Sequence, residues 1–87
     1  MTLDELEREK LATILAVDWA VLDEAEGKRL RALGVDEGTS LTVTHRGIFG
    51  GADPLAVTIG RMTIAMRRAH AAAVTVEISG QNAGERS

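Results

Sequence analysis

In four stretches of the second half of this chain, mostly apolar residues occupy every second position and alternate with small or polar ones. The residues in phase are Leu41, Val43 and His45; Leu55, Val57 and Ile59; Met62, Ile64 and Met66; and Val74, Val76 and Ile78. Because successive side chains of a β-strand point to opposite faces, this period predicts four short strands, each with one face toward a core. Gly60-Arg61 predicts a tight connection between the second and third strands, and residues 67–72 predict one helical turn before the fourth.

A fifth strand is predicted over residues 11–17, LATILAV, an apolar and β-branched run of strand length. Both of its faces are apolar, which predicts a central position in the sheet or a helix that covers it. Near the start of the chain, Thr2 is followed three residues later by Glu5. This spacing is typical of a capping box and predicts a short helical turn.

Residues 23–33 have the strongest helix pattern in the chain. Asp23 can cap the start, with Glu26 at the third helical position. Gly34 follows the last apolar position and can adopt the left-handed conformation that ends helices. Gly27 weakens the helix by roughly 1 kcal/mol relative to Ala. The apolar residues on one side of the predicted helix are Leu22, Ala25, Leu30, Ala32 and Leu33.

Five short strands and one inserted helix predict a mainly β fold, a small barrel or curled sheet, since closure removes exposed strand edges. A length of 87 residues allows one domain, which we place at residues 1–78. Residues 79–87 are polar and contain glycine, which predicts a disordered C-terminal tail. The core must be aliphatic, because the aromatic residues are Trp19 and Phe49 alone.

The composition also indicates the cellular compartment of the protein and excludes several kinds of reactive site. The chain has no Cys, which excludes disulfides, thiolate nucleophiles and iron–sulfur sites. The N-terminus is acidic, and no stretch approaches the roughly 20 apolar residues of a membrane span. We therefore expect a soluble, cytoplasmic protein without direct membrane insertion. The net charge of −3 and the scarcity of aromatic residues argue against a nucleic-acid partner.

The charge is divided unevenly along the chain. Residues 1–38 carry ten acidic and five basic side chains, whereas residues 39–87 carry three acidic and five basic ones. Either this difference in sign is ordinary surface scatter, or the basic side of the molecule faces an acidic partner.

Three segments, taken in order, resemble the FeoA family, whose domains adopt an SH3-like barrel. Residues 29–39, RLRALGVDEGT, are similar to the family's "RL-x-x-LG" helix stop, and residues 49–55, with FGG and PL, are similar to its Gly-rich loop before a strand. Residues 60–67, GRMTIAMR, resemble its "G-x-x-IALR" segment. The resemblance covers roughly residues 2–78. It departs at Arg8-Glu9, where the family often has Pro-Gly, and in the detail of the Gly-rich loop.

The resemblance implies an SH3-like β-barrel of about five strands with one inserted α-helix and a short N-terminal helical turn. It implies a cytoplasmic accessory protein of bacterial ferrous iron uptake, not an enzyme. Its partner would be FeoB, the membrane GTPase transporter, on whose cytoplasmic part it would dock and which it would modulate. The alternative is a free-standing regulatory barrel akin to the C-terminal domain of iron-dependent transcriptional repressors, although this chain has no helix-turn-helix segment to read DNA.

Two groups of residues are candidates for partner binding. Ile48 and Phe49 precede Gly50 and Gly51 in a loop, so Phe49 either closes one end of the barrel or forms an exposed apolar anchor. The second group is a predicted basic patch that contacts an acidic protein surface, unless it is a solvated rim. Its members are Arg67 and Arg68, with Arg61 and His70.

Metal binding and catalysis have little support in the sequence. His45 and His70 are the only imidazoles, and the chain has no His-x-x-x-His or Glu-x-x-His pair of the kind that iron or zinc sites use. We expect no cofactor and no metal site within one chain, while a site shared between chains and a weak homo-oligomer stay open. His45 is in phase with Leu41, which predicts a partly buried histidine. No nucleophile elbow is present, so we expect no catalysis.

Overall fold

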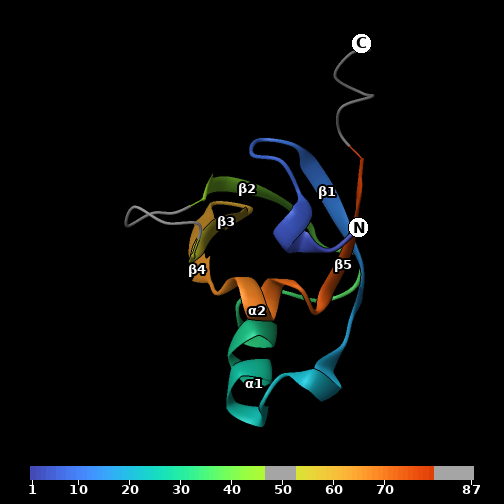
Figure 1. The fold of residues 1–87 in the computed structure, drawn as a ribbon, viewed down its shortest axis with the longest axis vertical. Coiled ribbons are helices and arrows are strands. Elements are labelled where there is room, and N and C mark those ends of the chain that lie inside the picture. Colours follow the sequence, from blue (N-terminus) through green and yellow to red (C-terminus); the bar gives the residue numbers. More distant parts are fainter. Residues whose placement is uncertain (47–52, 80–87) are drawn as a thin grey trace.

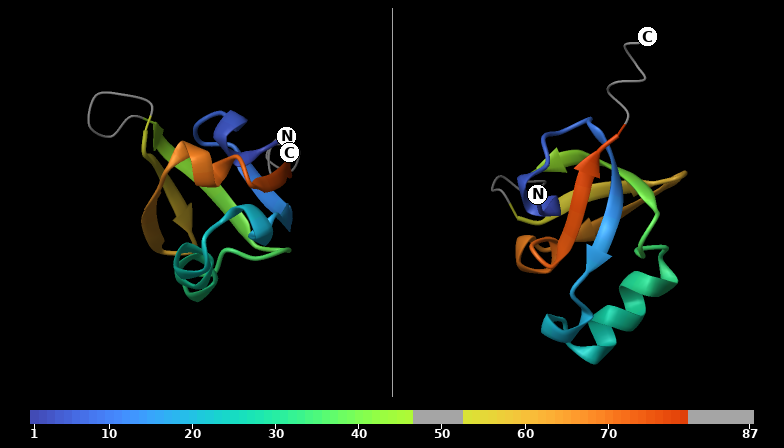
Figure 2. Two further views of the ribbon diagram at one scale, coloured as in Figure 1. Left: turned by 60° about the horizontal axis from the view of Figure 1, so that its bottom comes forward. Right: turned by 90° about the vertical axis from the view of Figure 1, so that its right-hand side faces the viewer.

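The structure is a computed structural model that describes residues 1–46 and 53–79. Its five strands are β1 (Leu11–Val17), β2 (Ser40–Arg46), β3 (Leu55–Ile59), β4 (Met62–Met66) and β5 (Val74–Ile78). They form one antiparallel sheet in the order β4-β3-β2-β1-β5, which curls around an apolar centre (Figures 1 and 2). The mainly β fold predicted from the alternation is confirmed.

Four short helical elements accompany the sheet. They are the 3-10 turns η1 (Leu3–Glu5) and η2 (Trp19–Val21) and the α-helices α1 (Glu24–Ala32) and α2 (Arg68–Ala71). In Figure 1, α1 extends below α2 and away from the sheet. The turn η2 was not predicted, because three residues are too few to show a helical period.

The local signals for helix ends are confirmed. The side chain of Asp23 accepts a hydrogen bond of 2.8 Å from the backbone N–H of Glu26. The backbone N–H of Thr2 donates one of 3.0 Å to Oε1 of Glu5, as expected of a capping box. Gly34 follows α1 with φ of +100°, the left-handed conformation that glycine adopts without steric cost.

The core is aliphatic, as predicted. Its most completely buried large side chains are Leu3, Leu6, Ile14, Leu30, Val35, Leu41, Val43, Leu55, Val57, Met66, Val74 and Val76. Among the described residues, no polar or charged residue is buried. The turn η1 packs against α2 and β5, so the start of the chain covers the core beside one edge strand.

The predicted internal position of β1 is confirmed, and the predicted core face of α1 is wrong in part. β1 lies between β2 and β5, while Leu11 and Leu15 on its outer face are 43% and 48% exposed. The pairing of β1 with β5 shifts between Ile14 and Ala16, a bulge that the sequence does not reveal. In α1, both predicted core alanines are exposed, and Leu30 is the one buried residue of the helix.

The turn before β1 contains Arg8-Glu9, where the sequence departs from the family's Pro-Gly. Glu9 has φ of +69°, and it is the one non-glycine residue with positive φ in the described ranges. Its N–H donates a hydrogen bond of 2.8 Å to the carbonyl oxygen of Val43, which holds the turn against β2. Glutamate thus occupies a backbone conformation that glycine prefers.

The described part of the chain ends just beyond β5. The backbone N–H of Ser79 donates a hydrogen bond of 2.9 Å to the carbonyl oxygen of Leu11, just beyond β5. Residues 80–87 lie outside the described residues, so the disordered tail stays a prediction.

None of the helices in residues 1–46 and 53–79 has the length and hydrophobicity needed to span a membrane.

Candidate binding site between α1 and α2

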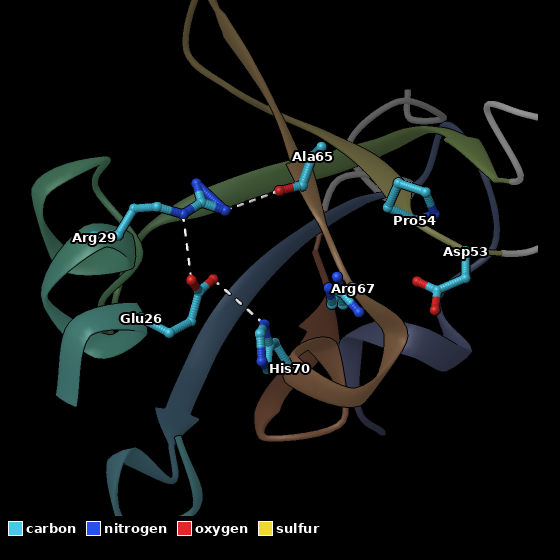
Figure 3. A pocket seen from close by; sticks show the side chains of 7 residues that line it. All are labelled: Glu26, Arg29, Asp53, Pro54, Ala65, Arg67 and His70. Atoms are coloured by element: carbon cyan, nitrogen blue, oxygen red, sulfur yellow. Dashed lines mark hydrogen bonds and ion pairs between the residues drawn. The ribbon is translucent and has the colours of Figure 1, made fainter. Parts of the chain in front are cut away.

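A pocket of about 400 Å³ lies between α1, the end of β4 and the start of α2 (Figure 3). Charged side chains from three separate segments converge on it. The residues that line it are Glu26, Arg29, Asp53, Pro54, Ala65, Arg67 and His70.

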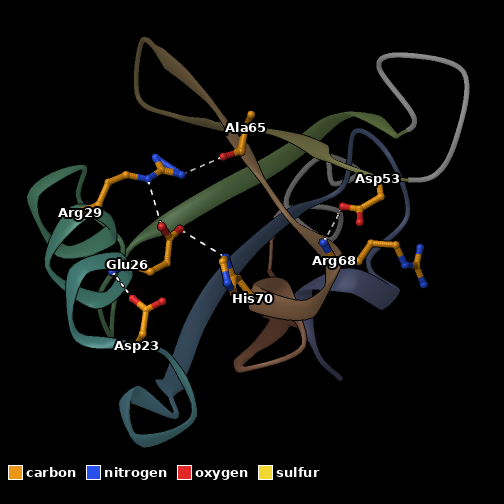
Figure 4. A network of polar contacts seen from close by, with 7 residues as sticks. All are labelled: Asp23, Glu26, Arg29, Asp53, Ala65, Arg68 and His70. Carbon is orange, nitrogen blue, oxygen red and sulfur yellow. Dashed lines mark hydrogen bonds and ion pairs between the residues drawn. The ribbon is translucent and has the colours of Figure 1, made fainter.

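Glu26 joins the two helices across this pocket. Its Oε2 lies 3.3 Å from Nδ1 of His70, and its Oε1 lies 3.4 Å from Nε of Arg29 (Figure 4). The side chains of Glu26 and His70 are 18% and 27% exposed, so this contact is shielded from most solvent. Nδ1 of His70 is itself buried and lacks hydrogen-bond geometry toward any described partner. Its contact with Glu26 is an ion pair only when the imidazole is protonated.

Arg29 connects α1 to the sheet. Its Nη2 donates a hydrogen bond of 3.1 Å to the carbonyl oxygen of Ala65 in β4. Together with the Glu26–His70 contact and the buried Leu30, this bond positions α1 over the pocket.

The residues of the predicted basic patch are divided among three places. Arg67 lines the pocket, and within the described residues its side chain makes no hydrogen bond or ion pair. The guanidinium of Arg68 lies 4.0 Å from Oδ2 of Asp4, and its backbone N–H donates to Oδ1 of Asp53 at 2.9 Å. Arg61 lies at the opposite end of the β3–β4 hairpin, about 20 Å from Arg67 along the strand.

The other candidates lie outside the described structure. Ile48, Phe49, Gly50 and Gly51 fall within residues 47–52, and the side chain of His45 is likewise outside the described part. Within residues 1–46 and 53–79, no three His, Cys, Asp or Glu side chains form a group that could hold a metal ion.

Three charged residues of the pocket were not among the predicted site residues. The sequence indicates a capping role for Glu26, and it gives no sign of a site role for Arg29 or Asp53. Their shared site arises from tertiary contacts between segments far apart in the chain, for which a local pattern gives no signal.

A second hollow lies on the outer side of α1. It is lined by Trp19, Leu22, Asp23, Glu24, Gly27, Lys28 and Arg31. The guanidinium of Arg31 stacks over the Trp19 ring, 4.2 Å from its centroid. A Cβ added to Gly27 would lie 3.6 Å from the same ring, so the indole packs where this glycine leaves the helix surface open.

Comparison with known proteins identifies relatives over nearly the whole described chain. The FeoA domain profile matches residues 1–78. FeoA of Stenotrophomonas maltophilia, a prokaryotic SH3 domain protein solved in complex with zinc, is 34% identical, with a TM-score of 0.74 and coverage of 88% of this chain and 89% of that one. FeoA of Chlorobium tepidum is 32% identical, with a TM-score of 0.78 and coverage of 93% and 73%.

Proteins outside these FeoA relatives share the same fold. A manganese-dependent transcriptional repressor matches with a TM-score of 0.72 at 19% identity, over 91% of this chain and 41% of the repressor. At this identity the match shows a shared fold alone. Curated protein sequences give no significant match. The predicted SH3-like architecture is confirmed, and the matched profile with its two structural relatives shows that this chain belongs to the FeoA family.

Proposed function

We propose that this protein is a cytoplasmic accessory protein of bacterial ferrous iron uptake. It docks on the cytoplasmic part of a FeoB-type GTPase transporter and modulates it through protein–protein contacts, without catalysis of its own. The observation that carries the proposal is the FeoA domain match over residues 1–78. The S. maltophilia relative, described as a candidate activating factor of bacterial ferrous iron transport, supports the same process.

The α1–α2 pocket is the surface that we assign to this contact. Arg67 offers a charge without a partner in the described structure, and uncommitted arginines are common anchors at protein interfaces. Phe49, the other candidate anchor, precedes the pocket residue Asp53 by a few positions in the sequence. The arrangement favours a partner surface that combines an acidic group with an apolar one.

Calorimetric titration of the full chain with the purified cytoplasmic part of the transporter from the same organism tests the proposal. We expect binding by the unmodified chain and a loss of about tenfold or more in affinity for Arg67→Glu, as for truncation or reversal of an interface charge. Arg61→Glu is the matched control, because the same charge reversal is made at the far end of the hairpin. Absence of binding by the unmodified chain would refute the proposal.

The second candidate is a regulatory barrel that acts with a transcriptional repressor. The likeness to the manganese-dependent repressor favours it at the level of fold. Affinity purification from the native host separates the two candidates. Recovery of a helix-turn-helix repressor in place of the transporter would support this second function.

A further inference from the structure

Among the strands of the described residues, β4 has a free edge on the side of the α1–α2 pocket. It is the last strand in the sheet order, and its neighbour on the other side is β3. The carbonyl oxygen of Ala65 accepts from Arg29 of α1, so it points away from β3. In an antiparallel strand the N–H and C=O of one residue point to the same side. The N–H of Ala65 therefore also faces the pocket side, as do both backbone groups of Thr63, two residues earlier.

The pocket continues this edge and carries an uncommitted positive charge. Ala65 lines the pocket at the end of β4, and Arg67 follows it there. The two carboxylates of the pocket are engaged, Glu26 with Arg29 and His70, and Asp53 with the backbone of Arg68. Arg67 has no such partner among the described residues. A ligand that enters along the edge would meet unpaired backbone groups first and a guanidinium next.

We propose that the free edge of β4 and the α1–α2 pocket bind an extended, acidic segment of a partner protein. The segment adds as a strand along Thr63 and Ala65 and places one carboxylate on Arg67. Strand addition derives affinity from main-chain hydrogen bonds and specificity from side-chain pockets. A guanidinium–carboxylate pair, often bidentate, supplies that specificity here. The inference rests on the proposed function for the identity of the partner, since it describes the kind of segment that the transporter would present.

The Arg29–Ala65 bond fits this account. Exposed strand edges invite unwanted pairing, and proteins protect them with charged side chains. In the free protein, Arg29 of α1 donates a hydrogen bond of 3.1 Å to the carbonyl oxygen of Ala65 on this edge (Figure 4). An incoming strand displaces this guanidinium, which then remains beside the pocket as a second cation for an acidic ligand.

Two phage-displayed libraries of short linear peptides provide the probe. They are identical except that one fixes Glu and the other fixes Lys at the central position, and both are selected on the intact full chain. We expect enrichment from the Glu library, and peptides that lose about tenfold or more in affinity for Arg67→Glu. A Lys-for-Glu exchange in the same peptide should restore binding to that variant. Absence of enrichment, or equal binding to Arg67→Glu, would overturn the proposal.

Ala65→Pro tests the strand addition separately. Proline lacks the N–H that faces the ligand, and edge strands tolerate it because that N–H takes no part in the ladder. We expect loss of peptide binding, with the far-ultraviolet circular dichroism spectrum unchanged. Binding by a folded Ala65→Pro variant would overturn the proposal. Should that variant not fold, the reciprocal charge exchange at Arg67 still decides.

The same variants separate this inference from the proposed function. Should the transporter bind Arg67→Glu and Ala65→Pro as tightly as the unmodified chain, docking would stand and the assigned surface would be wrong. Should the transporter not bind at all while acidic peptides do, the peptide site would stand and the proposed partner would be wrong. A dimer in sedimentation that Ala65→Pro dissociates would assign the edge to a second copy of this chain and overturn the inference.

Discussion

His70 of α2 lies 3.3 Å from Glu26 of α1, and this contact spans the pocket that separates the two helices. The attachment of α1 also includes the buried side chain of Leu30, the hydrogen bond from Arg29 to Ala65 and the stacking of Arg31 on Trp19. The shape of the pocket therefore depends on very few interactions. Single substitutions can therefore measure the contribution of each interaction to the stability of α1.

Glu26→Gln removes the charge that faces both Arg29 and His70. We expect the free energy of unfolding to fall by about 0.5–1 kcal/mol, near the top of the range for surface pairs, because the carboxylate is 18% exposed. Urea denaturation measures the change. Glu24→Gln on the same helix is the control, since this carboxylate is 86% exposed, and we expect almost no effect. Equal losses for the two variants would contradict the role given to Glu26.

Leu30→Ala removes the only buried side chain of α1. Truncation of a buried leucine costs about 2–5 kcal/mol, a large share of the stability of a small domain. We expect the amide protons of α1 to exchange much faster in this variant, as measured by hydrogen exchange. Replacement of the half-buried Leu33 by Ala should have a smaller effect. Unchanged protection of α1 in Leu30→Ala would show that other contacts hold the helix.

Glu9→Gly relieves the left-handed backbone at the turn before β1. A non-glycine residue pays about 1–2 kcal/mol in this conformation, partly offset by the greater freedom of glycine in the unfolded chain. We therefore expect thermal unfolding to show a net gain of about 0.5–1 kcal/mol. Gly38→Ala makes the opposite change where φ is +89° and no atom crowds the site, and should destabilise. A loss of stability in Glu9→Gly would contradict this interpretation of the turn.

Gly27→Ala should stabilise α1 by about 0.5–1 kcal/mol, because alanine favours a helix interior over glycine. The added Cβ would lie 3.6 Å from the Trp19 ring, an ordinary van der Waals distance. Unfolding followed by Trp19 fluorescence reports on this contact directly. Gly34→Ala, at φ of +100°, should instead destabilise. Destabilisation by Gly27→Ala would mean that the indole cannot accommodate the methyl group.

Local patterns predicted the elements, and tertiary contacts decided the site. Alternation located the strands because each buries one face, and Asp23 marked the start of α1 because capping needs only neighbouring residues. The bulge between Ile14 and Ala16 depends on how β1 pairs with β5, and the sequence gives no signal for it. The pairing of Glu26 with His70 depends on how α1 and α2 meet beside the pocket. The residues around Glu26 in the sequence show that it lies in the first turn of a helix, but they do not show that it lines a pocket. The sequence therefore indicated only the capping role.

The central claim, docking on the transporter, is tested most directly by nuclear magnetic resonance. Isotope-labelled chain is titrated with the unlabelled cytoplasmic part of the transporter, and the backbone amide signals are followed. The account predicts shifts or broadening for Ala65, Arg67 and His70, with the signals of Gly60 and Arg61 at the far end of the hairpin unchanged. A spectrum that stays the same at saturating transporter concentration would contradict it.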